Sequence, residues 1–206
     1  MIPRYQKILL ALLLIASLGM GFKLWQLRDR AHKRLLAGET TAPTQAPEVA
    51  PAEQATLVAA NDLDNSLIPQ MHSLPLPADP GARARAVLGK LLDLYAAQDS
   101  THPVPGGASS VAQVFLLPVP GRKASSDQLA VVNLTGTFAA SHPSGLETES
   151  LTVLSICATI RANFPNVTEV RFLVDGQPRP SLAGHADLTR TYLTADITPA
   201  SEGNKR

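Results

Sequence analysis

Histidine, cysteine and carboxylate side chains are the groups of this 206-residue chain that could do chemistry, but their spacing forms no recognised catalytic or metal-binding motif. The sequence has no His-x-x-x-His pair, no Cys-x-x-Cys pair and no paired-carboxylate spacing. It also lacks a Gly-x-Ser-x-Gly turn and a phosphate-binding Gly-Lys-Ser loop. We therefore expect no catalytic residue, no metal ligand and no cofactor. The histidines are far apart in the sequence: His32, His72, His102, His142 and His185.

The most concentrated polar group comprises Asp175, His185 and Asp187. These residue types could bind a ligand or act as a general base. The alternative is turn chemistry, because Asp175-Gly176 is a strong tight-turn signal and Gly184 is a position without a Cβ clash. In this second interpretation, which we favour, His185 and Asp187 hydrogen-bond the loop that contains them.

The single cysteine, Cys157, lies within an apolar helical pattern with Leu151, Leu154 and Ile160. One cysteine cannot form an internal disulfide, and a free thiol in such a pattern is typical of core packing rather than of catalysis. A bacterial lipoprotein needs a cysteine just after its signal segment, and residues 1–40 contain none. The sequence therefore disfavours a lipid anchor.

The N-terminal segment predicts attachment to a membrane. Residues 8–22 carry no charge, and extending this run to Leu27 gives a segment long enough to cross a bilayer, with Trp25 at interface depth. We interpret residues 8–27 as a transmembrane signal anchor in contact with membrane lipid. A cleaved signal peptide is the alternative. Basic residues flank the segment on both sides, so they do not determine its orientation.

The remaining composition divides the chain further. Residues 28–54 begin with a basic juxtamembrane stretch and continue as a Pro/Ala-rich linker that we expect to be disordered. The folded domain is predicted at residues 55–197, followed by a disordered tail at 198–206. The net charge of +1 gives no indication of nucleic-acid binding.

Two long helices are predicted in the domain. Asp79 is suited to cap the first, and Pro80 to occupy its first position. The second spans residues 145–163 and is ended by Pro165. The apolar residues of the first helix recur at helical spacing: Val87, Leu88, Leu91, Leu92 and Tyr95.

Strands are predicted on either side of these helices. Residues 55–60 and 67–76 are apolar, although prolines in the second run confine it to an edge or to irregular structure. Residues 111–117 and 129–138 predict a hairpin, with Asn133 and Thr135 on a solvated face, and residues 167–174 predict a further strand. The order predicts an α+β, two-layer fold: a mostly antiparallel sheet with two main helices on one face.

The C-terminal half resembles the GerMN domain, the sporulation and spore germination domain family. The matching features are the strand at 131–138, Phe164-Pro165, the strand and turn at 170–176, and the stretch 182–188. The resemblance covers residues 65–193, with Arg190 in place of the final proline of the family pattern. It implies an extracytoplasmic domain of a bacterial protein, without catalytic residues, that takes part in envelope or sporulation assembly.

We therefore expect a single-pass protein of the bacterial cytoplasmic membrane with a non-catalytic interaction domain outside the cytoplasm. Its partners would be other envelope proteins or further copies of the chain, meeting edge to edge or face to face. The proline-broken strand at 67–76 would offer a free edge. The alternative function is a module that binds cell wall or a small ligand, and an enzyme is disfavoured because no catalytic constellation is present.

Overall fold

The computed structural model describes residues 17, 20, 23, 52–119 and 126–197. The chain divides into two units, residues 1–48 and 49–206, and the folded domain belongs to the second. The predicted anchor at 8–27 lies outside the described residues, apart from positions 17, 20 and 23, and so do residues 28–51 and the tail at 198–206. Among the helices that the structure describes, none has the length and apolar character needed to cross a bilayer.

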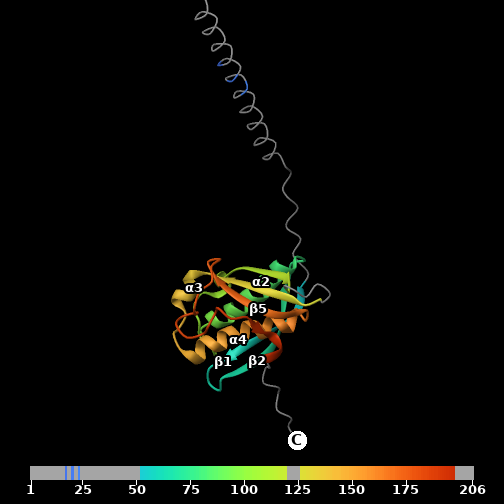
Figure 1. Ribbon diagram of the computed structural model, residues 1–206. Helices are drawn as coiled ribbons and strands as arrows, with labels where there is room; N and C mark the ends of the chain where they lie inside the picture. Colours follow the sequence, from blue (N-terminus) through green and yellow to red (C-terminus); the bar gives the residue numbers. More distant parts are fainter. Residues whose placement is uncertain (1–16, 18–19, 21–22, 24–51, 120–125, 198–206) are drawn as a thin grey trace, which may run out of the picture. The chain divides into compact units, whose positions relative to one another are not determined.

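The domain contains two separate sheets and three described α-helices (Figure 1). Two 3-10 helices, η1 (Gly107–Ser110) and η2 (Thr194–Asp196), complete the described elements. The mixed α+β class predicted from the sequence is confirmed. In chain order the strands and α-helices are β1 (Ala52–Asn61), β2 (Ser66–Pro75), α2 (Pro80–Ala96), β3 (Val111–Pro118), β4 (Gln128–Leu134), α3 (Gly136–Ser141), α4 (Leu146–Asn163), β5 (Val167–Val174) and β6 (Tyr192–Leu193).

The described strands pair mostly antiparallel, as predicted, but they form two sheets rather than the single predicted sheet. Strands β1 and β2 form an antiparallel hairpin of their own, and the other sheet has the order β3-β4-β5-β6. Within that sheet, β4 and β5 run parallel, while β3 and β6 are antiparallel to their neighbours. The reason is the connection through α3 and α4, which carries the chain back to the starting end of the sheet before β5 begins.

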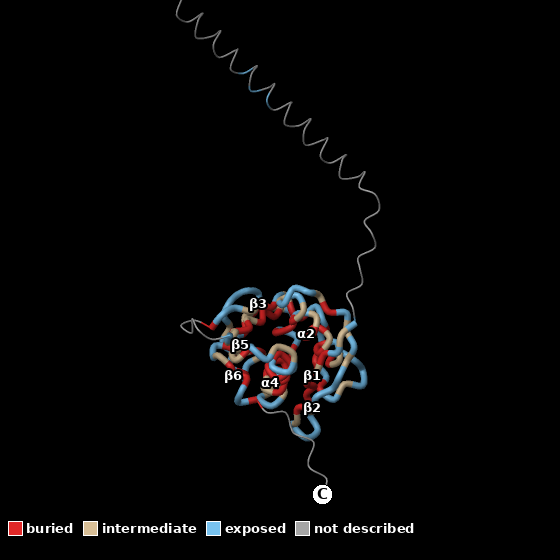
Figure 2. Tube along the Cα trace, turned by 90° about the vertical axis from the view of Figure 1, so that its right-hand side faces the viewer, coloured by how far each residue is buried: buried red, intermediate tan, exposed pale blue. Residues whose placement is uncertain are grey.

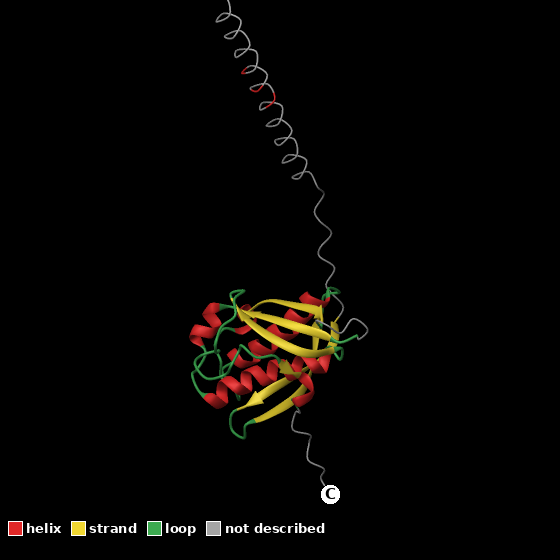
Figure 3. Cartoon of the chain, viewed as in Figure 1, coloured by secondary structure: helices red, strands yellow, loops and turns green. Residues whose placement is uncertain are grey.

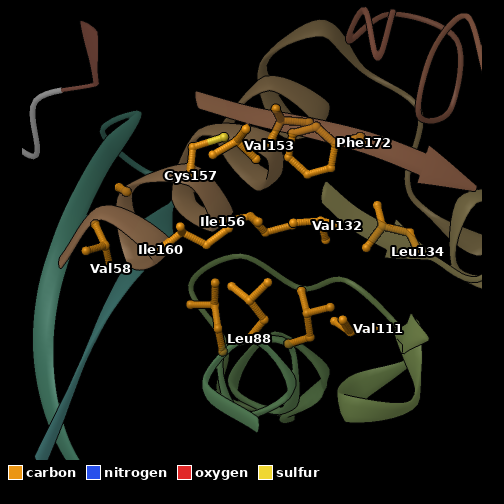
Figure 4. Close-up of a cluster of buried hydrophobic side chains, with 14 of the residues drawn as sticks. Val58, Leu88, Val111, Val132, Leu134, Val153, Ile156, Cys157, Ile160 and Phe172 are labelled. Carbon is orange, nitrogen blue, oxygen red and sulfur yellow. The ribbon is translucent and has the colours of Figure 1, made fainter. Parts of the chain in front are cut away.

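Helix α4 lies between the two sheets rather than on one face of a single sheet (Figures 2 and 3). It packs on β1 along one side and on β5 along another, so its residues from Leu151 to Ile160 are buried with the exception of Leu154. Figure 4 shows this core, with Val58 of β1 beside Ile160 of α4 and Val132 of β4 facing Ile156. Helix α2 packs on β3 and α4 on β5, so the prediction that both long helices cover one face of a sheet holds for the four-stranded sheet, and α4 packs in addition on β1.

The helix boundaries follow the local sequence signals. Asp79 caps α2 by accepting the backbone N–H of Ala82 at 2.7 Å, and Pro80 occupies the first position as predicted. Helix α4 starts after Gly145 and ends before Pro165. Both predicted long helices are thereby confirmed.

The predicted strand at 129–138 is too long, because β4 ends at Leu134. The Thr135 hydroxyl accepts the N–H of Phe138 and so caps α3. The Asp175 carboxylate accepts the N–H of Gly136 at 2.8 Å, which removes that group from any strand ladder. Local capping therefore overrides an apolar pattern that would otherwise continue the strand.

Candidate functional site

Polar side chains gather around the first two turns of α4, in what we call the α4 polar cluster: Glu149, Thr152, His102, His142, His185 and Asp62. Glu149 and Thr152 lie one turn apart on the helix, and both are fully buried. The histidines come from three different loops, so three of the five that are scattered in the sequence meet at one place in the fold.

Glu149 is held by the loop that follows residue 182. Its Oε2 atom accepts the backbone N–H groups of Ala183, His185 and Ala186 at 3.0, 2.9 and 2.9 Å. Its Oε1 atom accepts from Nδ1 of His185 at 2.9 Å and from the N–H of Gly145 at 3.2 Å. Burial favours the protonated carboxyl, but these hydrogen bonds outweigh burial and lower the pKa of Glu149 to about 2.

The predicted grouping of Asp175, His185 and Asp187 is not found. Asp175 holds the start of α3, Asp187 accepts the hydroxyl and backbone N–H of Thr189 at 2.6 and 2.8 Å, and His185 turns to Glu149. The hydrogen bonds from Thr189 lower the pKa of Asp187. Each aspartate therefore organises its own turn, which agrees with the favoured interpretation of turn chemistry.

The Asp175-Gly176 turn is confirmed. Both residues have positive φ, at 50° and 75°, and Val174 pairs with Gln177 across them. Asn133 was expected on a solvated face, but its Oδ1 accepts the N–H of Gly176 at 2.8 Å and the residue is buried. Asn133 therefore stabilises the Asp175-Gly176 turn instead of facing solvent.

A second part of the α4 polar cluster is an unbroken line of side chains that we call the histidine relay: Asp62, His102, Thr152 and His142. The Asp62 carboxylate lies 2.5 Å from Nδ1 of His102, whose Nε2 lies 2.7 Å from the Thr152 hydroxyl. The same hydroxyl lies 2.8 Å from Nε2 of His142, and Nδ1 of His142 lies 2.8 Å from the Pro143 carbonyl.

The carboxylate, imidazole and hydroxyl of the histidine relay resemble the order of groups that activates a nucleophile. However, His102 and Thr152 are fully buried, so a substrate cannot reach the hydroxyl. Tyr95 packs edge-on to the His102 ring at 4.7 Å, and Phe138 does the same to His142 at 5.5 Å. The arrangement therefore joins elements of the fold rather than presenting a reactive group.

Metal and thiol chemistry find no support in the described part of the chain. Within residues 52–119 and 126–197, no group of three or more His, Cys, Asp or Glu side chains is arranged to hold a metal ion. Cys157 is completely buried, as predicted, and burial raises the pKa of its thiol. A thiol in that state is a poor nucleophile.

One face of the four-stranded sheet packs on helices, and no helix within residues 52–119 and 126–197 covers the other face. On the helix side, Val114, Val132, Val170 and Phe172 are buried. The other side, which we call the open face, is also rich in apolar side chains, and Phe115, Leu117 and Leu193 are 44, 45 and 49% exposed. Strand register brings its residues together across the sheet: Phe115, Leu117, Val131, Leu173 and Leu193, with Glu169 and Arg171.

The free side of β1 is closed by side chains rather than by another strand. The N–H groups of Thr56, Val58 and Ala60 donate to Asn163, Thr159 and Tyr95, at 3.0, 2.9 and 2.9 Å. The carbonyl of Thr56 also accepts from the Asn163 amide at 2.7 Å. An exposed strand edge is a template for another strand, and this edge is not exposed.

The outer edge of β2 carries two prolines. Val58 turns its N–H away from β2, so its partner Pro69 occupies a position where an N–H would point outward. Pro75, opposite Ala52, stands at an equivalent position. The predicted edge strand is confirmed, but its prolines remove two of the donors that a further strand would need.

The outer edge of β3 is partly covered by α2. Arg85 donates from Nε to the Val111 carbonyl at 3.0 Å. A Cβ atom at Gly81 would lie 2.7 Å from the Val114 carbonyl oxygen, so only glycine permits this approach. Together with the prolines of β2, this contact favours the open face over the strand edges as a contact surface.

Two solved structures resemble the chain. The first contains the tandem GerMN domains of the sporulation protein GerM from Bacillus subtilis, with 17% identity and a TM-score of 0.39, and the match covers 70% of this chain and 47% of that one. The second is described as a lipoprotein from Clostridium perfringens, with 22% identity and a TM-score of 0.33, covering 75% of this chain and 95% of that one. The chain thus spans about half the length of the GerM structure.

No curated protein sequence matches the chain. The sequence model of the family named Germane, described as sporulation and spore germination, matches residues 58–180. That range runs from β1 to the loop beyond β5, and it contains the α4 polar cluster except for the loop around His185. Because the match extends over more than half of the 206 residues, the chain belongs to the sporulation and spore germination family.

Proposed function

We propose that this chain is a membrane-tethered, non-catalytic interaction module of the bacterial envelope, and that its open face binds a second copy of the chain. The observation that carries the proposal is the apolar character of that face, where Phe115, Leu117 and Leu193 remain about half exposed. Membership of the sporulation and spore germination family supports a role in sporulation-related assembly.

A second copy suits the open face because its charges can pair with themselves. Glu169 and Arg171 point to the same side of β5, two positions apart among apolar neighbours. A twofold axis between them would place each Arg171 against the Glu169 of the other copy. Isologous contacts require this kind of self-complementary surface.

The tether is the sequence-predicted anchor at 8–27, followed by the linker at 28–54, with the domain outside the cytoplasm. Protease added to intact spheroplasts tests this arrangement. The domain should be digested without lysis, whereas digestion only after lysis would place it in the cytoplasm and contradict the proposal.

Binding of cell-wall glycan is less well supported, because such sites use exposed aromatic rings. Tyr95 and Tyr192 are both buried, at 2 and 6% exposure. Among the exposed large apolar side chains that the structure describes, Phe115 alone is aromatic, and a single ring is too few for such a site.

Site-specific photocrosslinking of the full chain in its native membrane tests the contact. A crosslinking residue at Phe115 should give an adduct of twice the chain mass. The same residue at Leu63, which is 89% exposed in the β1–β2 turn, serves as the matched control and should give none. Equal adducts from both positions, no adduct from Phe115, or an adduct with a different protein would each contradict binding of a second copy.

A further inference from the structure

A pocket of about 280 Å³ lies beside α4, where the loop after residue 182 and strand β6 meet the helix. Much of its lining is apolar. Val153 and Leu154 come from α4, Ala186 from the loop and Tyr192 from β6, and all except Leu154 are buried. These side chains offer an apolar group of a ligand a surface on which it can leave water.

The same pocket is lined by two residues of opposite charge, Asp187 and Arg190, which are both exposed. Within the residues that the structure describes, neither of them forms an ion pair. A negative and a positive group therefore stand three positions apart on one pocket without neutralising each other through a direct contact. A ligand that carries both charges would complement them.

The guanidinium of Arg190 is held in place by an aromatic ring. It lies 4.2 Å from the centre of the Tyr192 ring, which itself lines the pocket. The Tyr192 hydroxyl donates to the Asp187 carbonyl at 2.6 Å, and its ring packs edge-on against Phe172 at 5.6 Å. Because the ring is fixed at both ends, the positive charge is oriented before a ligand arrives.

The carboxylate of Asp187 is also oriented and retains capacity to accept. Its Oδ1 atom accepts the hydroxyl and the backbone N–H of Thr189 at 2.6 and 2.8 Å, and the backbone N–H of Arg190 contributes as well. A carboxylate offers about four acceptor positions, so it can accept a further hydrogen from an ammonium group.

A simple anion suits this pocket less well. The backbone N–H groups of the loop at Ala183, His185 and Ala186 all donate to the buried carboxylate of Glu149, and the His185 ring turns its Nδ1 atom to the same carboxylate. A phosphate would need several such donors, and the charge of Asp187 would repel it. One guanidinium beside one carboxylate instead matches a ligand with one carboxylate and one ammonium.

We propose that this pocket binds a free α-amino acid with an apolar side chain. The carboxylate of the ligand pairs with Arg190, its ammonium pairs with Asp187, and its side chain packs against Leu154 and its apolar neighbours. The pocket volume is just below the range of about 300–1,000 Å³ that is typical for drug-sized ligands, so a small ligand is appropriate. The pocket is separate from the open face, because Tyr192 is buried whereas the adjacent Leu193 belongs to the open face.

NMR titration of the 15N-labelled full chain in detergent tests the proposal, with leucine as the probe. The amide signals of Leu154, Ala186 and Arg190 should shift and saturate. N-acetyl-leucine lacks the ammonium and leucinamide lacks the carboxylate, so each should bind about tenfold more weakly than leucine, the size of one charge-assisted hydrogen-bonded contact. Glycine, which lacks the apolar side chain, should also bind about tenfold more weakly.

This ligand series uses the unmodified chain, so its outcome does not depend on whether a variant folds. The absence of saturable shifts at these amides with leucine would overturn the proposal. Equal binding of leucine and N-acetyl-leucine, of leucine and leucinamide, or of leucine and glycine would overturn it too, because each pair differs in one of the three groups that the pocket is proposed to recognise.

Two variants test the residues. Arg190→Gln and Asp187→Asn should each weaken leucine binding about tenfold, and both positions are exposed, so the thermal unfolding midpoint should change little. Arg179→Gln is the matched control, since it removes the same charge from a residue that does not line the pocket, and its affinity for leucine should equal that of the unmodified chain. Unchanged binding in the first two variants, or an equal loss in all three, would contradict the assignment.

Discussion

Glu149 and Ala186 are joined by a hydrogen bond of 2.9 Å from the backbone N–H of Ala186 to a fully buried carboxylate oxygen. Together with the bonds from Ala183 and His185, it fixes the loop after residue 182 on the first turns of α4. A negative charge is thus the organising centre of a loop that contains no regular secondary structure.

The low pKa of Glu149 makes the stability of the domain depend on acid pH. The folded-state pKa of about 2 lies below the ordinary value of 4.5, so the charged form contributes fully above pH 4.5. This contribution, on the order of 3 kcal/mol, should be lost as the pH falls from 4.5 towards 2. Denaturant unfolding between pH 2 and pH 7 measures it.

Glu149→Gln should lower the free energy of unfolding by about 2–3 kcal/mol at pH 7 and flatten its dependence on acid pH, because an amide cannot accept as many N–H groups as a carboxylate. Glu147→Gln is the control, since Glu147 lies two positions away and is exposed. If both variants showed the same pH profile as the unmodified chain, Glu149 would not be the source of the acid sensitivity.

Thr159 should be important for stability because its hydroxyl accepts the buried N–H of Val58 at 2.9 Å. Thr159→Val preserves the shape of the side chain and leaves that N–H without a partner, so unfolding should become easier by about 1–3 kcal/mol. Thr159→Ser keeps the hydroxyl and should recover much of the loss. Equal destabilisation by the two variants would point to packing rather than to the hydrogen bond.

The two long helices could be predicted because their ends carry local signals, such as Asp79-Pro80 at the start of α2. The parallel pairing of β4 and β5 could not, because it depends on where α4 comes to rest. A helix apolar on one side would lie on one sheet, but α4 also buries Thr152 and Thr159 between two sheets. Nothing in their spacing shows that these hydroxyls would find partners in distant segments.

The α4 polar cluster could not be predicted from the sequence either, because its members are brought together by the tertiary fold. His102 and His142 are separated by 40 positions, as are Asp62 and His102, and no short motif connects them. Glu149 was visible as an acidic residue in the first turn of a helix, where a dipole interaction would explain it. Its loop partners lie more than 30 residues away. Long-range hydrogen bonds of this kind depend on the whole topology and produce no periodic pattern in the sequence.

Gly176 should resist substitution for conformational reasons alone. Its φ of 75° is unfavourable for other residues, although a Cβ atom there would meet no atom within 4 Å. Gly176→Ala should therefore destabilise the domain by about 1 kcal/mol. Gly145→Ala is the matched control, because its φ of 166° is extended and its Cβ would meet only the Thr148 hydroxyl, at 3.7 Å. A thermal unfolding midpoint that falls equally in both variants would contradict this explanation.

Phe115 should matter for association and not for folding. Its ring is 44% exposed on the open face, so Phe115→Lys removes little buried surface and should change the free energy of unfolding by no more than about 0.5 kcal/mol. A charge at the centre of an apolar contact has to be desolvated when two copies meet, so the variant should be monomeric at concentrations where the unmodified chain is dimeric. Analytical ultracentrifugation of both full chains in the same detergent measures the difference.

Met71→Lys, at a residue of β2 that is 73% exposed, provides the control and should dimerise normally. A dimer that survives Phe115→Lys would exclude the open face as the contact, whereas loss of the dimer in both variants would mean that added positive charge, rather than its position, prevents association.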